Sequence, residues 1–252
     1  MTNKKNKKSK NLIIVFILLL LFIFGSAFII FQTDIFYISE INVENNYALE
    51  DEYIIKNSKV TENNNIFLLN IKDIKRNLRK EVYIKDVNIK RIFPDKLLID
   101  VLERTGRIKY SDNQKNILLD FDGVVLKKIE KERDLILINS EIDVDKKLGE
   151  KIELDNTNIN FDKILKLTKY IYENNETLNY SILMKKNNTY CIIDNDTYIK
   201  LDLEESLEYQ YEFGLDIIEK REDKGESVNG VIDFTKGDNP IYVSFKDLED
   251  DI

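Results

Sequence analysis

Three short stretches carry residue types that enzymes use. Residues 111–113 read Ser-Asp-Asn, one of the three motifs of penicillin-recognising enzymes, but the chain has no Ser-x-x-Lys and no Lys-Thr-Gly. Residues 120–122 (Asp-Phe-Asp) and 194–196 (Asp-Asn-Asp) carry oxygen ligands for a metal ion, but the calcium-loop spacing is absent. Both lie at predicted hairpin turns, where Asp and Asn are favoured for structural reasons. We therefore predict structural roles for all three stretches, with no metal site and no cofactor.

The composition excludes the common nucleophilic mechanisms. The 252 residues include no histidine and one cysteine, Cys191, so Ser-His-Asp and Cys-His pairs cannot form. Cys191 lies in the predicted strand TYCIID, and we expect it to be a small buried hydrophobe. A glycosidase-type pair of carboxylates needs no histidine, and the 46 acidic residues leave such a pair open. A membrane-anchored cell-wall hydrolase that uses carboxylates is therefore the alternative function.

Residues 12–31 form one uninterrupted apolar segment without a charge. A helix of this length spans about 30 Å, the thickness of the hydrocarbon core of a bilayer. Residues 1–11 form a basic tail with five lysines and no acid, which predicts a cytoplasmic N-terminus and an extracytoplasmic remainder. A cleaved signal peptide is the competing interpretation, with a small-residue site at 25–27. The apolar run continues through residue 31, so we favour an uncleaved anchor.

The rest of the chain is strongly acidic. The tail contributes five positive charges to a net charge of −8, which leaves −13 on residues 32–252. This charge argues against nucleic acid as a partner and against close contact with an anionic lipid surface. It favours solubility, and it would suit a basic partner.

The first extracytoplasmic block, residues 35–104, predicts a β-α-α-β-β domain. Strands are predicted at 36–45, 87–93 and 96–103, and the first helix at 48–58. Asn70 is a suitable N-cap for a second helix, and Phe93-Pro94-Asp95-Lys96 suits a type I turn. Two helices on one face of a three-stranded sheet would bury one core.

The second block, residues 107–245, predicts an antiparallel-rich sheet with packed helices, and the overall fold class is α+β. Asp122-Gly123 suggests a type I′ hairpin turn. Tyr209, Tyr211 and Phe213 alternate within a predicted helix, so some of these side chains should be partly exposed, and we favour core packing over a partner contact. Residues 246–252 form an acidic tail. Further strands are predicted within 118–128, 135–140, 178–202 and 230–245, and helices at 160–174 and 204–222.

The stretch KRIFPDKLLIDVLER (90–104) ends the first block and carries a family pattern. With residues 87–89 it fits V-x-x-x-R-x-x-P-x-x-L-x-I-x-V-x-E-R. Together with Asn65-Ile66-Phe67 upstream and Gly230-Val231-Ile232-Asp233 downstream, it resembles the bacterial cell-division family FtsQ, called DivIB in Gram-positive species. The first block is similar to the POTRA domain of that family. The charged or turn-forming members of the pattern, which we take as structural family markers, are Arg91, Pro94, Glu103 and Arg104.

The resemblance implies a scaffold at the division septum rather than an enzyme. It implies binding to two bitopic partners, FtsL-like and FtsB/DivIC-like proteins, in support of septal peptidoglycan synthesis. The septal peptidoglycan synthase is a further candidate partner. Partner binding in the family involves the last strands of the second domain, where strand addition to an unpaired edge is physically sensible. The residues that we expect to contact a partner are Val231, Phe234, Ile241, Tyr242, Val243 and Phe245.

Overall fold

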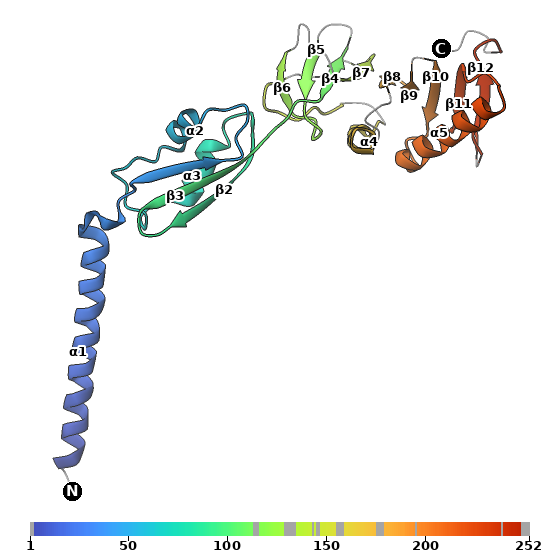
Figure 1. The fold of residues 1–252 in the computed structure, drawn as a ribbon. Coiled ribbons are helices and arrows are strands. Elements are labelled where there is room, and N and C mark those ends of the chain that lie inside the picture. The colour runs from blue at the N-terminus through green and yellow to red at the C-terminus, as the bar shows by residue number, and fades with distance from the viewer. Residues whose placement is uncertain are drawn as a thin grey trace. The chain divides into compact units, whose positions relative to one another are not determined.

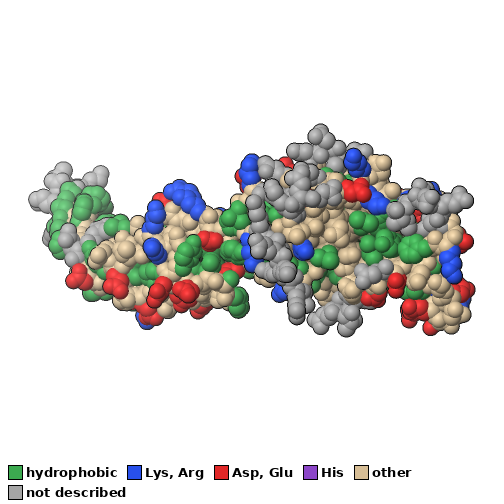
Figure 2. Space-filling view, turned by 90° about the horizontal axis from the view of Figure 1, so that it is seen from above, with side chains coloured by type: hydrophobic (Ala, Val, Ile, Leu, Met, Phe, Trp, Pro, Cys, Tyr) green, Lys and Arg blue, Asp and Glu red, His purple; other side chains and the backbone are tan. Residues whose placement is uncertain are grey.

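The computed structural model describes residues 3–112, 116–128, 135–142, 144, 147–154, 159–174, 179–194, 196–237 and 239–247. The chain divides into two compact units, Met1–Arg104 and Thr105–Ile252 (Figure 1). Acidic side chains are visible on the surface of both units (Figure 2).

The first unit begins with the long helix α1 (Asn3–Gln32). Within it, Leu12–Ile30 has a mean hydropathy of 3.2 and is long and apolar enough to cross a membrane. The expected apolar segment is therefore helical, as a single-pass anchor requires. The 3₁₀ turn η1 (Asp34–Phe36) follows directly and leads into the first strand.

The remainder of the first unit has the predicted order β-α-α-β-β. The sheet order is β1-β3-β2, with β1 parallel and β2 antiparallel to the central strand β3. Alternate residues of β3, namely Leu97, Ile99 and Val101, are buried in one core with residues from both helices. The elements are β1 (Glu40–Glu44), α2 (Asp51–Ser58), α3 (Ile71–Leu78), β2 (Ile84–Ile92) and β3 (Lys96–Glu103).

Local sequence determines how these elements begin and turn. Asn70 is the N-cap of α3, because its Oδ1 accepts hydrogen bonds from the N–H groups of Lys72 (3.1 Å) and Asp73 (3.4 Å). The β2–β3 turn lies at Pro94, as predicted. Ile92 pairs with Lys96, and the Phe93–Pro94 peptide bond is cis, which the sequence did not indicate.

The second unit contains one nine-stranded sheet in the order β12-β11-β10-β9-β8-β7-β4-β5-β6. Five of the eight pairings between these described strands are antiparallel, and three are parallel. Strand β4 was not predicted. The strands are β4 (Ile108–Ser111), β5 (Asn116–Leu119), β6 (Val125–Lys128), β7 (Ile136–Ser140), β8 (Tyr180–Met184), β9 (Thr189–Ile193), β10 (Thr197–Leu201), β11 (Gly230–Asp233) and β12 (Ile241–Ser244).

Two helices cover one face of this sheet. Helices α4 (Phe161–Asn174) and α5 (Leu207–Asp223) bury side chains in the same continuous core cluster. A Cβ on Gly214 of α5 would collide with Ile199 of β10, so this glycine lets the helix approach the sheet closely. Each helix connects two neighbouring parallel strands, β7 to β8 and β10 to β11, as β-α-β units do.

The predicted type I′ turn at Asp122-Gly123 is wrong. Such a turn needs positive φ at both central residues, but only Gly123 has one (φ 80°). Asp120 instead organises a longer connection, because its Oδ1 accepts hydrogen bonds from the N–H groups of Asp122 and Val124, both at 2.9 Å. This buried aspartate has the turn-forming role that was predicted for the Asp-Phe-Asp stretch.

Candidate functional site

The residues expected to contact a partner lie on β11, on β12 and in the segments that follow each strand. These strands are antiparallel, with Val231 opposite Val243 and Asp233 opposite Ile241. Strand β12 is the last strand of the sheet order, so no described strand lies on its outer side. The site is therefore an open sheet edge.

The backbone direction shows which groups this edge presents. The N–H of Phe245 donates to Asn229 O (3.3 Å), so the odd-numbered residues direct their backbone groups towards β11. Tyr242 and Ser244 accordingly direct theirs outward, although Ser244 O accepts a hydrogen bond from the Asp247 N–H (2.9 Å). Pro240 has the same parity and no N–H, so it restricts strand addition at the start of β12. Among the described residues, the backbone groups that this edge leaves open are the N–H and C=O of Tyr242 and the N–H of Ser244.

The side chains of the six predicted residues divide between the two faces of the sheet. By register, Val231, Val243 and Tyr198 of β10 form one cross-strand row, and Ile241 continues the same face beside Asp233. Phe245 joins this face through an edge-to-face contact with Tyr198 (ring centroids 5.3 Å apart). Ile241 is 49% exposed, whereas Val231 is buried and its side chain is inaccessible to a partner.

Tyr242 and Phe234 lie on the opposite face, beside α5. Both pack against the main core, and Phe234 is in ring contact with Phe213 of α5 (6.1 Å). The Arg221 guanidinium lies 3.6 Å from the centroid of the Tyr242 ring, and the Tyr242 hydroxyl donates to Ser227 O (3.0 Å). These contacts hold the Tyr242 side chain in place. The sequence did not predict the contact with Arg221, because the two residues are distant along the chain.

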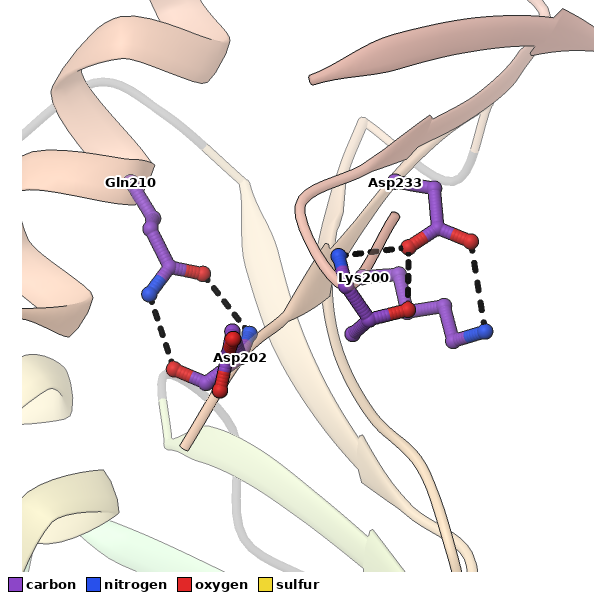
Figure 3. Close-up of polar contacts among 5 residues, drawn as sticks. Lys200, Asp202, Gln210 and Asp233 are labelled. Atoms are coloured by element: carbon purple, nitrogen blue, oxygen red, sulfur yellow. Dashed lines mark hydrogen bonds and ion pairs between the residues drawn. The ribbon is translucent and has the colours of Figure 1, made fainter. Parts of the chain in front are cut away.

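Buried polar contacts fix the strands behind the edge (Figure 3). Lys200 and Asp233 face each other across β10 and β11, with Nζ 3.3 Å from Oδ2. Burial would raise the pKa of Asp233, but hydrogen bonds from Thr235 and Lys200 outweigh it and hold the pKa below its ordinary value. The buried Gln210 side chain bonds both the N–H and the C=O of Asp202, each at 2.8 Å, and so ties α5 to the end of β10.

Glycine is required where β11 meets β12. A Cβ on Gly230 would collide with the carbonyl oxygen of Val243 and would come within 2.9 Å of the Tyr242 ring. The Val243 carbonyl and the Tyr242 ring lie so close to the Cα of Gly230 that only a hydrogen atom fits there in place of a side chain. The glycine of the Gly-Val-Ile-Asp stretch therefore has a packing function at the candidate site.

The family markers of the first unit lie in loop contacts instead of a binding pocket. The Glu103 carboxylate accepts three backbone N–H bonds, from Tyr47 (3.1 Å), Ala48 (2.8 Å) and Leu49 (3.1 Å). The Arg91 guanidinium donates to the carbonyls of Ile66 and Leu69, both at 2.8 Å. Through these contacts both residues position loops of the first unit.

The other two markers lie at the ends of β3. Arg104 donates its backbone N–H to Tyr83 O (2.7 Å) just after the strand, and Pro94 occupies the turn before it.

The catalytic interpretations gain no support from the geometry. Cys191 is fully buried, and burial raises the pKa of its thiol to about 12, which leaves it protonated and unreactive. Within the described residues no group of three or more His, Cys, Asp or Glu side chains could hold a metal ion. Asp194 lies in a turn with φ 47°, and Ser111 is in β4. Asn113 and Asn195 lie outside the described residues.

The alternating aromatics of α5 have different environments. Tyr211 is fully buried, as core packing predicts. Tyr209 is exposed, as the alternation predicts for part of this set, and its ring lies 5.7 Å from that of Phe213, so core packing does not extend to Tyr209. The helical period of 3.6 explains the difference, because alternate residues cannot all share one face.

The fold and the apolar helix define the class: a protein with one helix long and apolar enough to cross a membrane, followed by a POTRA-type domain. Residues 36–104 match the family described as POTRA domain, FtsQ-type. The cell division protein DivIB of Clostridium tetani is 30% identical over 222 residues, which cover 84% of this chain and 80% of that protein. DivIB of Clostridium botulinum (strain Hall) is 24% identical over 247 residues, covering 95% and 93%. FtsQ of Syntrophotalea carbinolica is 34% identical over 103 residues, covering 40% and 36%. The chain belongs to the DivIB/FtsQ family of cell-division proteins, and it has a role in cell division.

Proposed function

We propose that this protein is a single-pass scaffold of the divisome whose edge strand β12 binds bitopic division proteins outside the membrane. The expected partners are FtsL-like and FtsB/DivIC-like proteins, and their assembly would support septal peptidoglycan synthesis. The observation that carries the proposal is the open edge at Tyr242 and Ser244, with the exposed Ile241 beside it. An extended partner segment would pair with the backbone and place alternate side chains on the faces of the sheet.

One backbone donor provides a sharp test. Ser244→Pro removes an outward N–H, while Val243 already has the extended conformation that a following proline requires. Ser244→Ala is the matched control, because it also removes the hydroxyl but keeps the N–H. The Kd for an FtsB/DivIC-like partner would be measured with the full-length protein in nanodiscs. We expect roughly fivefold weaker binding for Ser244→Pro, since one net hydrogen bond contributes about 1 kcal/mol. Equal affinities for the two variants would refute strand addition.

The proposal includes an orientation with the N-terminus in the cytoplasm. The tail before the span supports this orientation, because it contains five lysines and no acidic residue. A reporter active only outside the membrane, fused after Ile252, should be active, and the same reporter fused before Met1 should be silent. The reverse pattern would contradict the orientation.

We also propose that this protein acts as a scaffold and not as an enzyme. The full chain in detergent should release no fragments from purified peptidoglycan, whereas a muramidase run in parallel does. Sustained release would favour the carboxylate hydrolase instead.

The division role also predicts where the protein is found. A fluorescent fusion should gather at the septum of dividing cells, and a uniform membrane signal would count against the division role.

A further inference from the structure

The end of the POTRA domain that follows the membrane helix carries a cluster of exposed apolar side chains. Of the eight large hydrophobic residues that are exposed within residues 33–104, five belong to three segments at this end. We call them the membrane-proximal patch: Ile35, Phe67, Leu68, Ile92 and Phe93. Ile35 is 60% exposed, Leu68 66% and Phe93 57%. Contiguous apolar patches on a protein surface mark sites that contact another protein or a membrane.

Backbone hydrogen bonds and ring contacts hold the three segments together. The N–H of Ile66 donates to Phe36 O (2.8 Å), and the N–H of Ser39 donates to Asp95 O (2.9 Å). The Phe67 ring contacts Phe36 edge to face and stacks on Phe93, with both centroid distances 5.1 Å. The patch is therefore a fixed surface built from residues distant in sequence.

The distance along the chain identifies the occupant. Ile35 is five residues after Ile30, the last residue of the apolar span, so at most about 18 Å of chain separates them. Part of that stretch is helical and therefore shorter, since α1 extends to Gln32. The headgroup layer adds roughly 5–8 Å to each side of the hydrocarbon core. The Nδ2 of Asn65, in the loop before Phe67, donates to Ile30 O (2.7 Å), which ties this loop to the end of the span.

We propose that the membrane-proximal patch inserts into the headgroup region of the outer surface of the bilayer and seats the POTRA domain on the membrane. Phenylalanine and leucine side chains are suited to the boundary between headgroups and acyl chains. A hollow of about 190 Å³ beside the patch is lined by Tyr37, Leu68, Leu69 and the amides of 63–65, all uncharged. Amide N–H groups at this level can donate hydrogen bonds to lipid carbonyl and phosphate oxygens, and they bring no charge of their own into the headgroup layer. The inference concerns the lipid contact alone and does not depend on partner binding at β12.

The absence of tryptophan from the chain makes the test direct. Phe93→Trp and, as a control, Tyr47→Trp would each introduce a single tryptophan into the full-length protein. Tyr47 is 89% exposed and follows β1, whose five residues lead away from the patch over about 16 Å. Both variants would be reconstituted sparsely in vesicles that contain lipids brominated near the headgroup, which quench tryptophan only on close contact.

We expect the tryptophan at position 93 to be blue-shifted and quenched several-fold more strongly than the one at position 47. Equal quenching at the two positions would overturn the proposal. A blue shift at position 93 that needs a high protein density in the vesicles would also overturn it, since a second copy of the chain would then be the occupant. Urea titration of both variants shows whether the domain remains folded, and Phe67→Trp provides a second probe if Phe93→Trp does not fold.

Discussion

The Glu103 carboxylate should determine whether the segment between β1 and α2 is ordered. Glu103→Gln keeps the length of the side chain but replaces one acceptor oxygen by an amide donor. In the structure Oε2 accepts from Tyr47 and Ala48, and Oε1 accepts from Leu49. Either orientation of the glutamine amide places N–H against N–H on one side. The exposed Tyr47 can turn to water, whereas Leu49 is half-buried and packs against the core.

The expected loss is about 1.5–3 kcal/mol of local stability, the range for hydrogen bonds to charged groups. Amide hydrogen exchange of the full-length protein in nanodiscs would show it as roughly ten- to hundredfold faster exchange at Ala48 and Leu49. Glu44→Gln is the matched control, because it makes the same chemical change at an exposed carboxylate of β1. Unchanged exchange in Glu103→Gln, or the same acceleration in Glu44→Gln, would refute the role of these three bonds.

Three further substitutions probe the core and the edge. Leu97→Ala removes a fully buried side chain from β3 and should lower the free energy of unfolding by about 2–5 kcal/mol in urea titration. Gly230→Ala places a methyl group against Val243 O and should lower it by roughly 1–3 kcal/mol, with faster amide exchange in β12. Asp233→Asn should be less stable than the wild type above pH 3.8, the ordinary pKa of this carboxyl, and the difference should shrink as the pH falls through the lower folded pKa. A difference that is constant with pH would contradict the role of the Asp233 charge.

The sequence predicts the POTRA domain well because its signals are local. Leu97, Ile99 and Val101 alternate along β3, and Asn70 precedes a helical stripe, so period and cap identify these elements without tertiary information. The resemblance to DivIB/FtsQ is most specific in the same domain, where the turn proline and the charged residues of 90–104 have a fixed spacing.

The sheet order of the second unit depends on non-local pairing, which spacing does not show. Strand β4 has only four residues and lies between β5 and the distant β7, so its stability comes from neighbours and not from its own pattern. At the candidate edge, alternation predicts that Ile241 and Val243 share a face. It does not show that α5 covers the other face, nor that Val231 is buried within the first one. The cover by α5 follows from how closely Gly214 lets the helix approach β10, and Val231 on the opposite face lies between Tyr198 and Val243.

Two of the three charged markers, Glu103 and Arg91, position loops at opposite ends of the POTRA domain. Glu103 holds residues 47–49 after β1, whereas Arg91 bonds the carbonyls of Ile66 and Leu69, the residues on either side of Phe67 and Leu68. Arg91 therefore fixes the loop that supplies two side chains of the membrane-proximal patch. A guanidinium suits this task, since its planar donors reach two carbonyls at once while an ammonium is a single compact charge. Glu103 and Arg91 are thus loop-positioning residues, and Arg91 connects the family pattern to the surface that we propose lies on the membrane.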